Sequence, residues 1–226
     1  MKKKFRQIVR CVGLISILAF ASSCDKNEDE GNNNSGVATE YAESCIPYYV
    51  VPDTLVLKEG KYLDSEPVVP ICVEGKCIYQ NHDSDKAQYE ALAKKYGDIG
   101  YNRKTSIGRE GAISVAIDSI SVVSDADIDA SHPKGTELSD IVKLYSKNYY
   151  TYIKSGYKDE IAESDGEHYK FISEYTKEDL TLLFNRHGLI FHLDNTMAFK
   201  GTQNLAITIY FENGKILSAT QSINFD

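Results

Sequence analysis

Three carboxylates alternate in the segment SDADIDASH. Asp125, Asp127 and Asp129 are each separated by one residue, a spacing at which their oxygens can reach one hard cation, as in calcium loops. The rest of an EF-hand is missing, because Ala130 stands where such a loop needs Gly and Thr136 stands where it needs Glu. Two interpretations stay open: a weak calcium site, and an exposed turn whose Asp side chains accept hydrogen bonds from nearby backbone N–H groups.

A tyrosine cluster in LYSKNYYTYIKSGY is the second candidate site. Tyr149, Tyr150, Tyr152 and Tyr157 offer flat rings and hydroxyl groups, which suit a sugar or a protein surface. Tyrosine also fills cores, so burial of about half of these rings is the alternative. The chain contains 16 Tyr and no Trp, and the lack of Trp weighs against a glycan site.

Motifs that would indicate catalysis are missing from the sequence. There is no H-E-x-x-H, no G-x-S-x-G, no P-loop and no G-x-G-x-x-G. Paired carboxylates for glycoside hydrolysis are close in space and not in sequence, so they cannot be recognised here. We therefore predict a protein that is not an enzyme and has no cofactor beyond calcium, with a carboxylate-type hydrolase as the alternative.

The first 24 residues have the composition of an export signal. Residues 2–10 carry five Lys or Arg and no acid, residues 11–21 are nearly all apolar, and small residues precede Cys24. Basic, apolar and small-residue regions in this order are typical of a secretory signal. A short transmembrane anchor is the alternative, although a spanning helix needs about 20 apolar residues.

The segment Ala21-Ser22-Ser23-Cys24 resembles a bacterial lipobox, although the consensus has Leu where this chain has Ala21. The resemblance implies that residues 1–23 are a lipoprotein signal peptide and that Cys24 becomes the lipidation site. The sulfur would then carry a diacylglycerol, and acyl chains such as palmitate would hold the protein on a membrane. Each buried CH₂ contributes about 0.8 kcal/mol, so more than one chain makes the anchor stable.

An acidic, polar segment follows the cysteine. Residues 24–40 are too polar to bury a core, so we predict a disordered tether. An acidic patch directly after the lipidated Cys also resembles the surface-export signal of Bacteroidota lipoproteins. That resemblance implies an outer-membrane protein at the cell surface, and a tether that faces the periplasm is the alternative.

The charge balance excludes one class of partner. Of the 25 Lys and Arg residues, five lie in residues 2–10, so removal of residues 1–23 leaves 20 against 33 acidic residues, a formal charge of −13. Nucleic-acid binding needs clustered cations to neutralise phosphates, so we exclude it.

The cysteines of an exported chain would meet an oxidising compartment. Cys72 and Cys77 flank Glu74-Gly75 in PICVEGKCIY, which has the form of a short hairpin. We predict a Cys72–Cys77 disulfide, which leaves Cys45 without a disulfide partner. Pairing of Cys45 with either of the other two is the alternative.

Residues 41–226 are predicted to form a single β-rich domain. An amphipathic helix is expected in SDKAQYEALAKKYGD, and a second short helix is expected in residues 136–146. A bulge is expected near Asp118-Ser119, where the alternation slips by one residue, and Asn213-Gly214 predicts a type I′ hairpin turn. These features favour a mainly β fold, an immunoglobulin- or transthyretin-like β-sandwich with one or two short helices.

Residues 120–142, ISVVSDADIDASHPKGTELSDIV, resemble small uncharacterised lipoproteins of gut Bacteroidota. The group has no established activity, so the resemblance implies a location and a β-rich fold. Asp53-Thr54-Leu55 and Asp118-Ser119-Ile120 also resemble the O-glycosylation acceptor of Bacteroidota. We expect a non-enzymatic surface protein that binds a glycan or a protein, with a periplasm-facing assembly subunit as the alternative.

Overall fold

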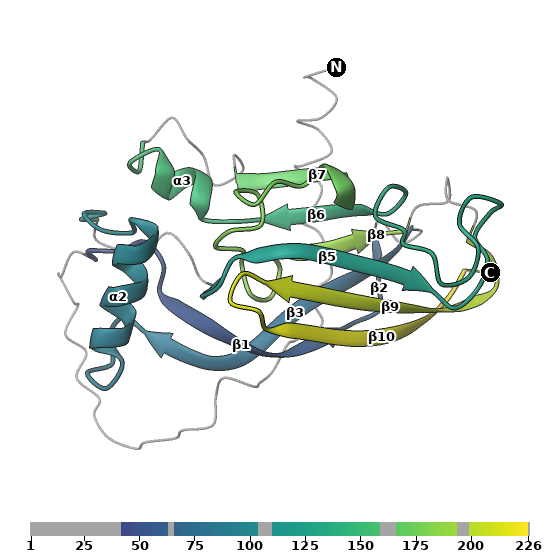
Figure 1. The fold of residues 1–226 in the computed structure, drawn as a ribbon. Helices are drawn as coiled ribbons and strands as arrows, with labels where there is room; N and C mark the ends of the chain where they lie inside the picture. Colours follow the sequence, from purple (N-terminus) through teal and green to yellow (C-terminus); the bar gives the residue numbers. More distant parts are fainter. Residues whose placement is uncertain (1–41, 63–65, 104–109, 159–165, 194–198, 226) are drawn as a thin grey trace.

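The computed structural model describes residues 42–62, 66–103, 110–158, 166–193 and 199–225 (Figure 1). The predicted signal peptide, the tether and Cys24 lie outside these residues. The elements, in chain order, are β1 (Tyr48–Leu57), β2 (Gly60–Tyr62), β3 (Glu66–Tyr79), α2 (Lys86–Tyr96), β4 (Ala112–Ile113), β5 (Ile117–Ser124), β6 (Lys143–Lys147), α3 (Tyr150–Lys154), β7 (Glu167–Phe171), the 3₁₀ turn η3 (Ile172–Glu174), β8 (Leu189–His192), β9 (Thr202–Phe211) and β10 (Ile216–Asn224).

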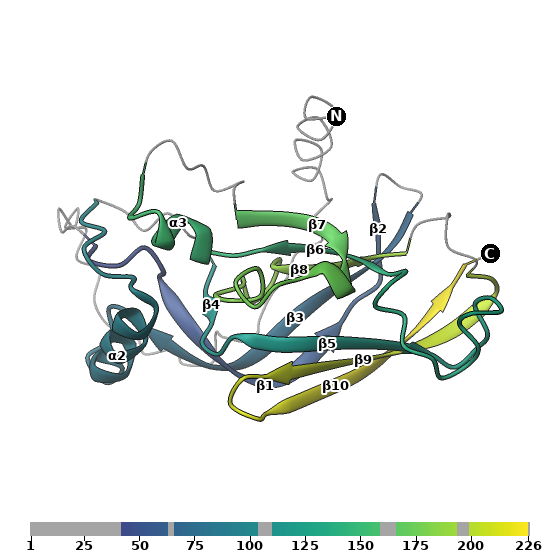
Figure 2. The ribbon, with the colours of Figure 1, turned by 45° about the horizontal axis from the view of Figure 1, so that its top comes forward.

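The strands form two sheets that lie in separate layers (Figure 2). The larger sheet has the order β4-β1-β3-β8-β6-β7, with β2 paired to β3, and the smaller sheet has the order β10-β9-β5. The prediction of a mainly β fold with few short helices is confirmed. No helix in the described ranges is long and apolar enough to cross a bilayer.

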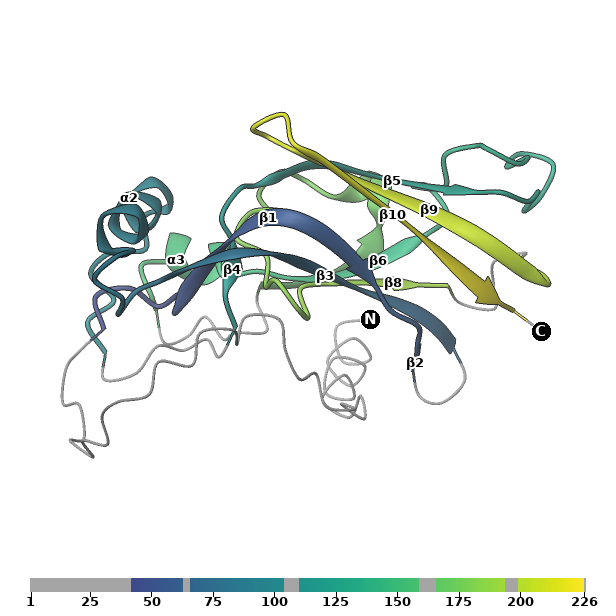
Figure 3. The same cartoon turned by 90° about the horizontal axis from the view of Figure 1, so that it is seen from below.

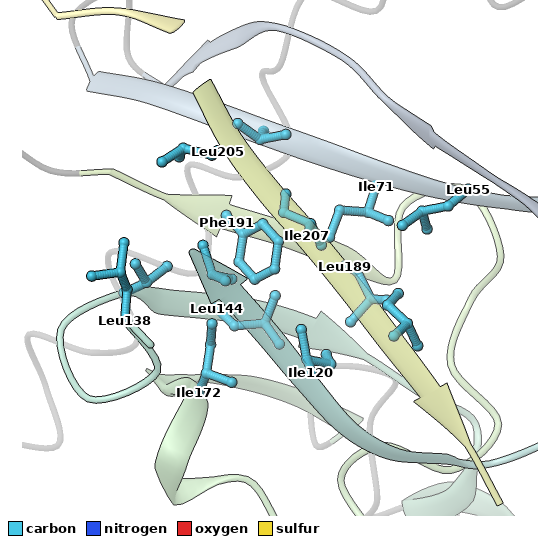
Figure 4. Packing of buried hydrophobic residues seen from close by; sticks show 14 of the residues in the cluster. Leu55, Ile71, Ile120, Leu138, Leu144, Ile172, Leu189, Phe191, Leu205 and Ile207 are labelled. Carbon is cyan, nitrogen blue, oxygen red and sulfur yellow. The ribbon is translucent and has the colours of Figure 1, made fainter. Parts of the chain in front are cut away.

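The main core lies between the two sheets (Figure 4). Leu144 of β6 and Phe191 of β8 face Ile120 of β5 and Ile207 of β9 across it, and all four are buried. Burial of a side chain of this size stabilises the folded state by about 1.5–3 kcal/mol. This packing holds the smaller sheet against the larger one. The other face of the smaller sheet is left to solvent.

A second core lies at the end of the larger sheet where the two helices are found, at the left in Figure 1. Tyr89 and Ala93 are the buried face of α2, as the helical spacing predicts. The helix ends at Gly97, whose φ of 76° is the left-handed conformation that a glycine adopts without a steric penalty. The same cluster holds Tyr49 of β1 and Ile78 of β3, so these strands contribute to both cores.

The predicted Cys72–Cys77 hairpin is wrong. β3 runs without interruption through Glu74-Gly75 and pairs with β1 on both sides of that point. Five residues of strand separate the two cysteines by about 16 Å and put them on opposite faces, whereas a disulfide needs Cα atoms within about 7 Å. No disulfide links the three cysteines that lie within the described residues.

Gly75 serves a close approach between strands and not a turn. It lies opposite Pro52, beside the bulge that Asp53 makes in β1. A Cβ atom at Gly75 would overlap the carbonyl oxygen of Val51, and backbone cannot move aside as a side chain can.

Three local predictions have different outcomes. The bulge near Asp118-Ser119 is confirmed, because the β5–β9 register shifts between Ile117 and Ser119. The β9–β10 hairpin forms, but Gly214 alone of the two central residues has a positive φ, so the loop is a type I turn with a glycine bulge and not type I′. The helix predicted in residues 136–146 is wrong, since a turn leads there into β6.

We expect Gly75→Ala to lower the free energy of unfolding by about 1–3 kcal/mol, the usual cost of overpacking. The measurement is urea unfolding of both chains, with Lys76→Ala at the exposed neighbouring position as the control. Equal stabilities of Gly75→Ala and the parent chain would contradict the close approach.

Candidate binding surface

The predicted tyrosine site lies mostly inside the protein, which corrects the expectation of an exposed binding face. Tyr149, Tyr152 and Tyr157 are only 3, 8 and 9% exposed. The Tyr149 hydroxyl donates to the Glu110 carbonyl oxygen at 2.6 Å, and its ring stacks on Phe184 with centroids 4.2 Å apart. The rings of these three tyrosines therefore fill the second core, the alternative that the sequence left open.

Tyr150 is the one member of the predicted set that reaches the surface. Its side chain is half-buried, and its hydroxyl lies 3.5 Å from a carboxylate oxygen of Glu178. The ammonium group of Lys154 lies 5.7 Å from its ring centroid. A single half-buried ring is a small platform for a ligand.

A buried carboxylate that the sequence did not reveal organises this second core. Asp98 is 0% exposed and accepts hydrogen bonds from the backbone N–H groups of Cys45 at 2.8 Å and Ile46 at 3.1 Å. The Tyr157 hydroxyl donates to it at 2.9 Å. Asp98 therefore ties the segment before β1 to the end of α2 and to the chain after α3.

Burial keeps the groups around Asp98 protonated. Desolvation, and then the nearby Asp98 carboxylate, raise the pKa of the Cys45 thiol and the pKa of the Tyr157 phenol. The same two causes raise the pKa of the Tyr89 phenol. Cys45 is therefore a buried thiol and not a reactive thiolate.

The three carboxylates of the acidic turn point to different partners. Asp125 accepts from the backbone N–H of Asn204 at 2.8 Å, and Asp127 accepts from that of Lys134 at 2.7 Å. Asp129 accepts from the backbone N–H groups of residues 131 and 132. The structure thus gives each carboxylate its own backbone donor, and no three His, Cys, Asp or Glu side chains of the described ranges form a metal-binding group. Calcium binding stays a prediction.

A histidine in the same loop lies between two carboxylates. His132 Nδ1 is 2.9 Å from Asp129, and Nε2 is 3.3 Å from both carboxylate oxygens of Asp140. A carboxylate can only accept, so both ring nitrogens can donate only in the imidazolium form. Hydrogen bonds to Asp129 and Asp140 accordingly raise the pKa of His132, and the bond to His132 lowers the pKa of Asp129.

Two further clusters carry residue types that occur in hydrolases. Asp179 lies 3.4 Å from His168 Nε2 and 2.7 Å from Lys170 Nζ, and its carboxylate also accepts from Thr176. On β6, Ser146 is the Cα partner of His168, but it is 0% exposed and makes no hydrogen bond to that ring within the described part of the chain. This cluster joins β7 to the loop that follows η3.

The second of these clusters holds two carboxylates, each beside a base. Glu110 Oε1 lies 2.5 Å from His187 Nδ1, and Glu167 Oε1 lies 3.2 Å from Lys147 Nζ. Burial, and then Glu167, raise the pKa of the Tyr145 phenol, with a smaller contribution from Glu110. These pairs hold the residue types that the alternative function, a carboxylate-type hydrolase, would need.

The surface that stands out is the outer face of the smaller sheet, on the side away from the main core. On β9, buried and outward positions alternate strictly, with Ile207 and Ile209 in the core. The outward positions are Ser119, Ser121 and Val123 on β5, Thr202, Asn204, Ala206, Thr208 and Tyr210 on β9, and Ile216, Ser218, Thr220, Ser222 and Asn224 on β10.

None of the outward strand positions of this face is a charged residue, although the carboxylates of Glu137 and Asp125 reach its margin and accept hydrogen bonds from the side chains of Ser121 and Asn204. The chain is 26% charged, so a random surface of that size would hold about three charges, and exposed positions usually hold more than the average. Tyr210 and Ile216, 38 and 56% exposed, are Cα partners at one end of it. Beside them, the hydroxyl groups of Thr208 and Ser218 hydrogen-bond across the strands at 2.9 Å.

The two sequences that resemble glycosylation acceptors also lie at the surface. Thr54 and Ser119 are both exposed, and each directly follows the extra residue of a β-bulge, Asp53 and Asp118 respectively. Ser119 belongs to the uncharged outer face, as the Cα partner of Tyr210.

Comparison of the chain with family models, curated proteins and solved structures finds no match in any of the three.

We expect Asp98→Ala to lower the free energy of unfolding by about 3 kcal/mol, because it leaves two buried N–H groups without an acceptor and leaves the Tyr157 hydroxyl only the longer bonds, at 3.4 Å, to the Gly97 and Ile99 carbonyl oxygens. Asp98→Asn keeps one acceptor oxygen and should lose less. Urea unfolding measures both, with Asp83→Ala at an exposed position as the control. A loss no larger than that of the control would show that the carboxylate is dispensable.

The raised pKa of His132 makes part of the stability depend on pH. This contribution is complete below the unfolded-state pKa of about 6.5 and is lost as the pH rises through the higher pKa of the folded state. The difference in stability between the parent chain and His132→Gln should therefore shrink from pH 6 to pH 9, as measured by urea unfolding. His82→Gln is the control, and an NMR titration that put the pKa of His132 at or below 6.5 would contradict the expectation.

Proposed function

We propose that this protein is a lipid-anchored outer-membrane protein whose β domain is a non-enzymatic binding module at the cell surface. The lipobox-like segment that ends at Cys24 supports the anchor. The observation that carries the binding function is the outer face of the smaller sheet, whose own strand positions hold no charged residue. The buried tyrosines have no part in it.

The ligand proposed for this face is a neutral glycan. Sugars present hydroxyl groups and apolar C–H faces, which match a row of hydroxyl side chains beside an exposed aromatic ring. The face offers this combination in Thr208, Ser218 and Tyr210. The chain has 33 acidic and 25 basic residues, so its net field would repel an anionic ligand.

The proposed orientation can be tested by protease shaving of intact cells. A domain that faces outward is degraded, while a periplasmic control protein survives. A domain that survives in intact cells and is cut only after lysis would face the periplasm, and the assembly-subunit function would then replace the proposed one.

We expect Tyr210→Ala to weaken binding to neutral oligosaccharides by about tenfold or more, since stacking on an aromatic ring contributes roughly 1–2 kcal/mol. The measurement is titration calorimetry against a panel of glucans, mannans and galactans. Tyr210→Phe keeps the ring and should retain binding. A panel without any binder, or equal binding by Tyr210→Ala, would contradict the glycan proposal.

We expect Cys24→Ala to abolish the incorporation of labelled palmitate and to release the protein from the membrane pellet. Cys45→Ala is the matched control, because that cysteine is buried in the folded domain and should leave labelling unchanged. Full labelling of Cys24→Ala would contradict lipidation at this position.

A further inference from the structure

The smaller sheet ends at an open edge. Within the described residues β10 pairs with β9 alone, and it lies at the margin of its sheet beside β1 of the other layer (Figure 3). The hairpin bond from Phe211 N–H to the Lys215 carbonyl oxygen sets the alternation of the ladder. Because Lys215 bonds to β9, the odd-numbered residues of β10 direct their N–H and C=O groups toward β9, and the even-numbered residues direct theirs away from it.

The middle of this edge is accessible for pairing. No hydrogen bond in the described part of the chain reaches the backbone of Ser218 or Thr220 from the open side, and the Ser222 carbonyl oxygen accepts from the side chain of the adjacent Gln221 at 3.1 Å. β10 contains no Pro, no Gly and no charged residue from Ile216 to Asn224. A long edge strand of this composition is a template for another strand.

Neighbouring edges of the two sheets carry the features that prevent such pairing. β1 has Pro52, which lacks an N–H, and a bulge at Asp53. The far edge of β5 is covered, because Leu138 N–H donates to the Val122 carbonyl oxygen and Glu137 accepts from Val122 N–H. β7 is short and carries Glu167 and Lys170. Within the described residues, the edge of β10 therefore lacks the protection that these three edges have.

The inward side chains of β10 are incompletely covered. Leu217 and Ala219 are only half-buried, whereas their Cα partners Ile209 and Ile207 on β9 are fully buried. At the start of the strand Ile216 is 56% exposed. A further strand beside β10 would remove this apolar area from water.

We propose that β10 pairs antiparallel with β10 of a second copy of this chain, so that the two smaller sheets become one continuous sheet. The register that uses the whole strand places Thr220 opposite its own copy and Ser218 opposite Ser222 of the other. Short hydroxyl side chains then face each other, a favourable cross-strand combination. The chain is net negative, so two copies repel wherever acidic surfaces meet, and an uncharged strip is where they can approach.

A disulfide trap tests this pairing in membranes of cells that express the full chain. Directly opposite, hydrogen-bonded strand residues have Cα atoms about 5.5 Å apart, within the range of a disulfide. Thr220→Cys should give several-fold more covalent dimer on oxidation with copper phenanthroline than the parent chain, which sets the background of its five cysteines. Ala206→Cys is the matched control, since Ala206 is the Cα partner of Thr220 on the same face but on the inner strand β9.

If Thr220→Cys formed no more covalent dimer than the parent chain, the proposal would be overturned. If Ala206→Cys gave as much covalent dimer as Thr220→Cys, the cross-link would reflect random collision and the proposal would be overturned. A cross-linked band whose mass shows a different protein would overturn it as well. A second measurement tests the register: differently tagged Ser218→Cys and Ser222→Cys chains, expressed together, should form more mixed dimer than either forms alone. A shared protease-resistant fragment shows that each variant is folded.

Discussion

The buried carboxylate of Asp98 is the interaction on which the helical end of the domain depends. A carboxylate withdrawn from water is costly unless its oxygens accept hydrogen bonds, and Asp98 meets this need with two backbone N–H groups and a phenol. It joins three separate segments: its own position at the end of α2, the chain before β1 and the chain after α3. The position of the tyrosines follows from this arrangement, because Tyr157 is drawn inward to donate to Asp98 and packs against Tyr152 and Tyr101 there.

The burial of the tyrosines changes which surface can carry a function. The hydroxyl groups of Tyr149 and Tyr157 have internal acceptors, the Glu110 carbonyl oxygen and the Asp98 carboxylate, so these rings gain little from facing water. The smaller sheet has the opposite character. Its inner face is fixed by the main core, and its outer face has no structural need to lack charge. The absence of charged residues from its outward strand positions is the reason why we propose this face as a binding surface.

Sequence patterns were informative where one face of an element is buried. The helical spacing in SDKAQYEALAKKYGD, the slip at Asp118 and the hairpin at Asn213-Gly214 all predicted features that the structure has. They were misleading at Glu74-Gly75 and in residues 136–146. A Gly can allow a turn or a close approach between strands, and only the position of Val51 decides between them. In residues 136–146 the apolar residues have helical spacing, but the end of this segment forms strand β6, which pairs with β7 and β8.

The sequence by itself determined the mainly β character, the clearest helix and the uncharged composition of β10, because these depend on periodicity and residue type within one segment. The tertiary structure alone decided that the tyrosines are buried, that Asp98 joins three segments, and that the three Asp carboxylates of residues 125–129 have separate partners. It also decided that β10 lies at an open edge. Those features depend on which distant segments become neighbours, and the burial and hydrogen bonding of a polar side chain are properties of those neighbours and not of its own spacing.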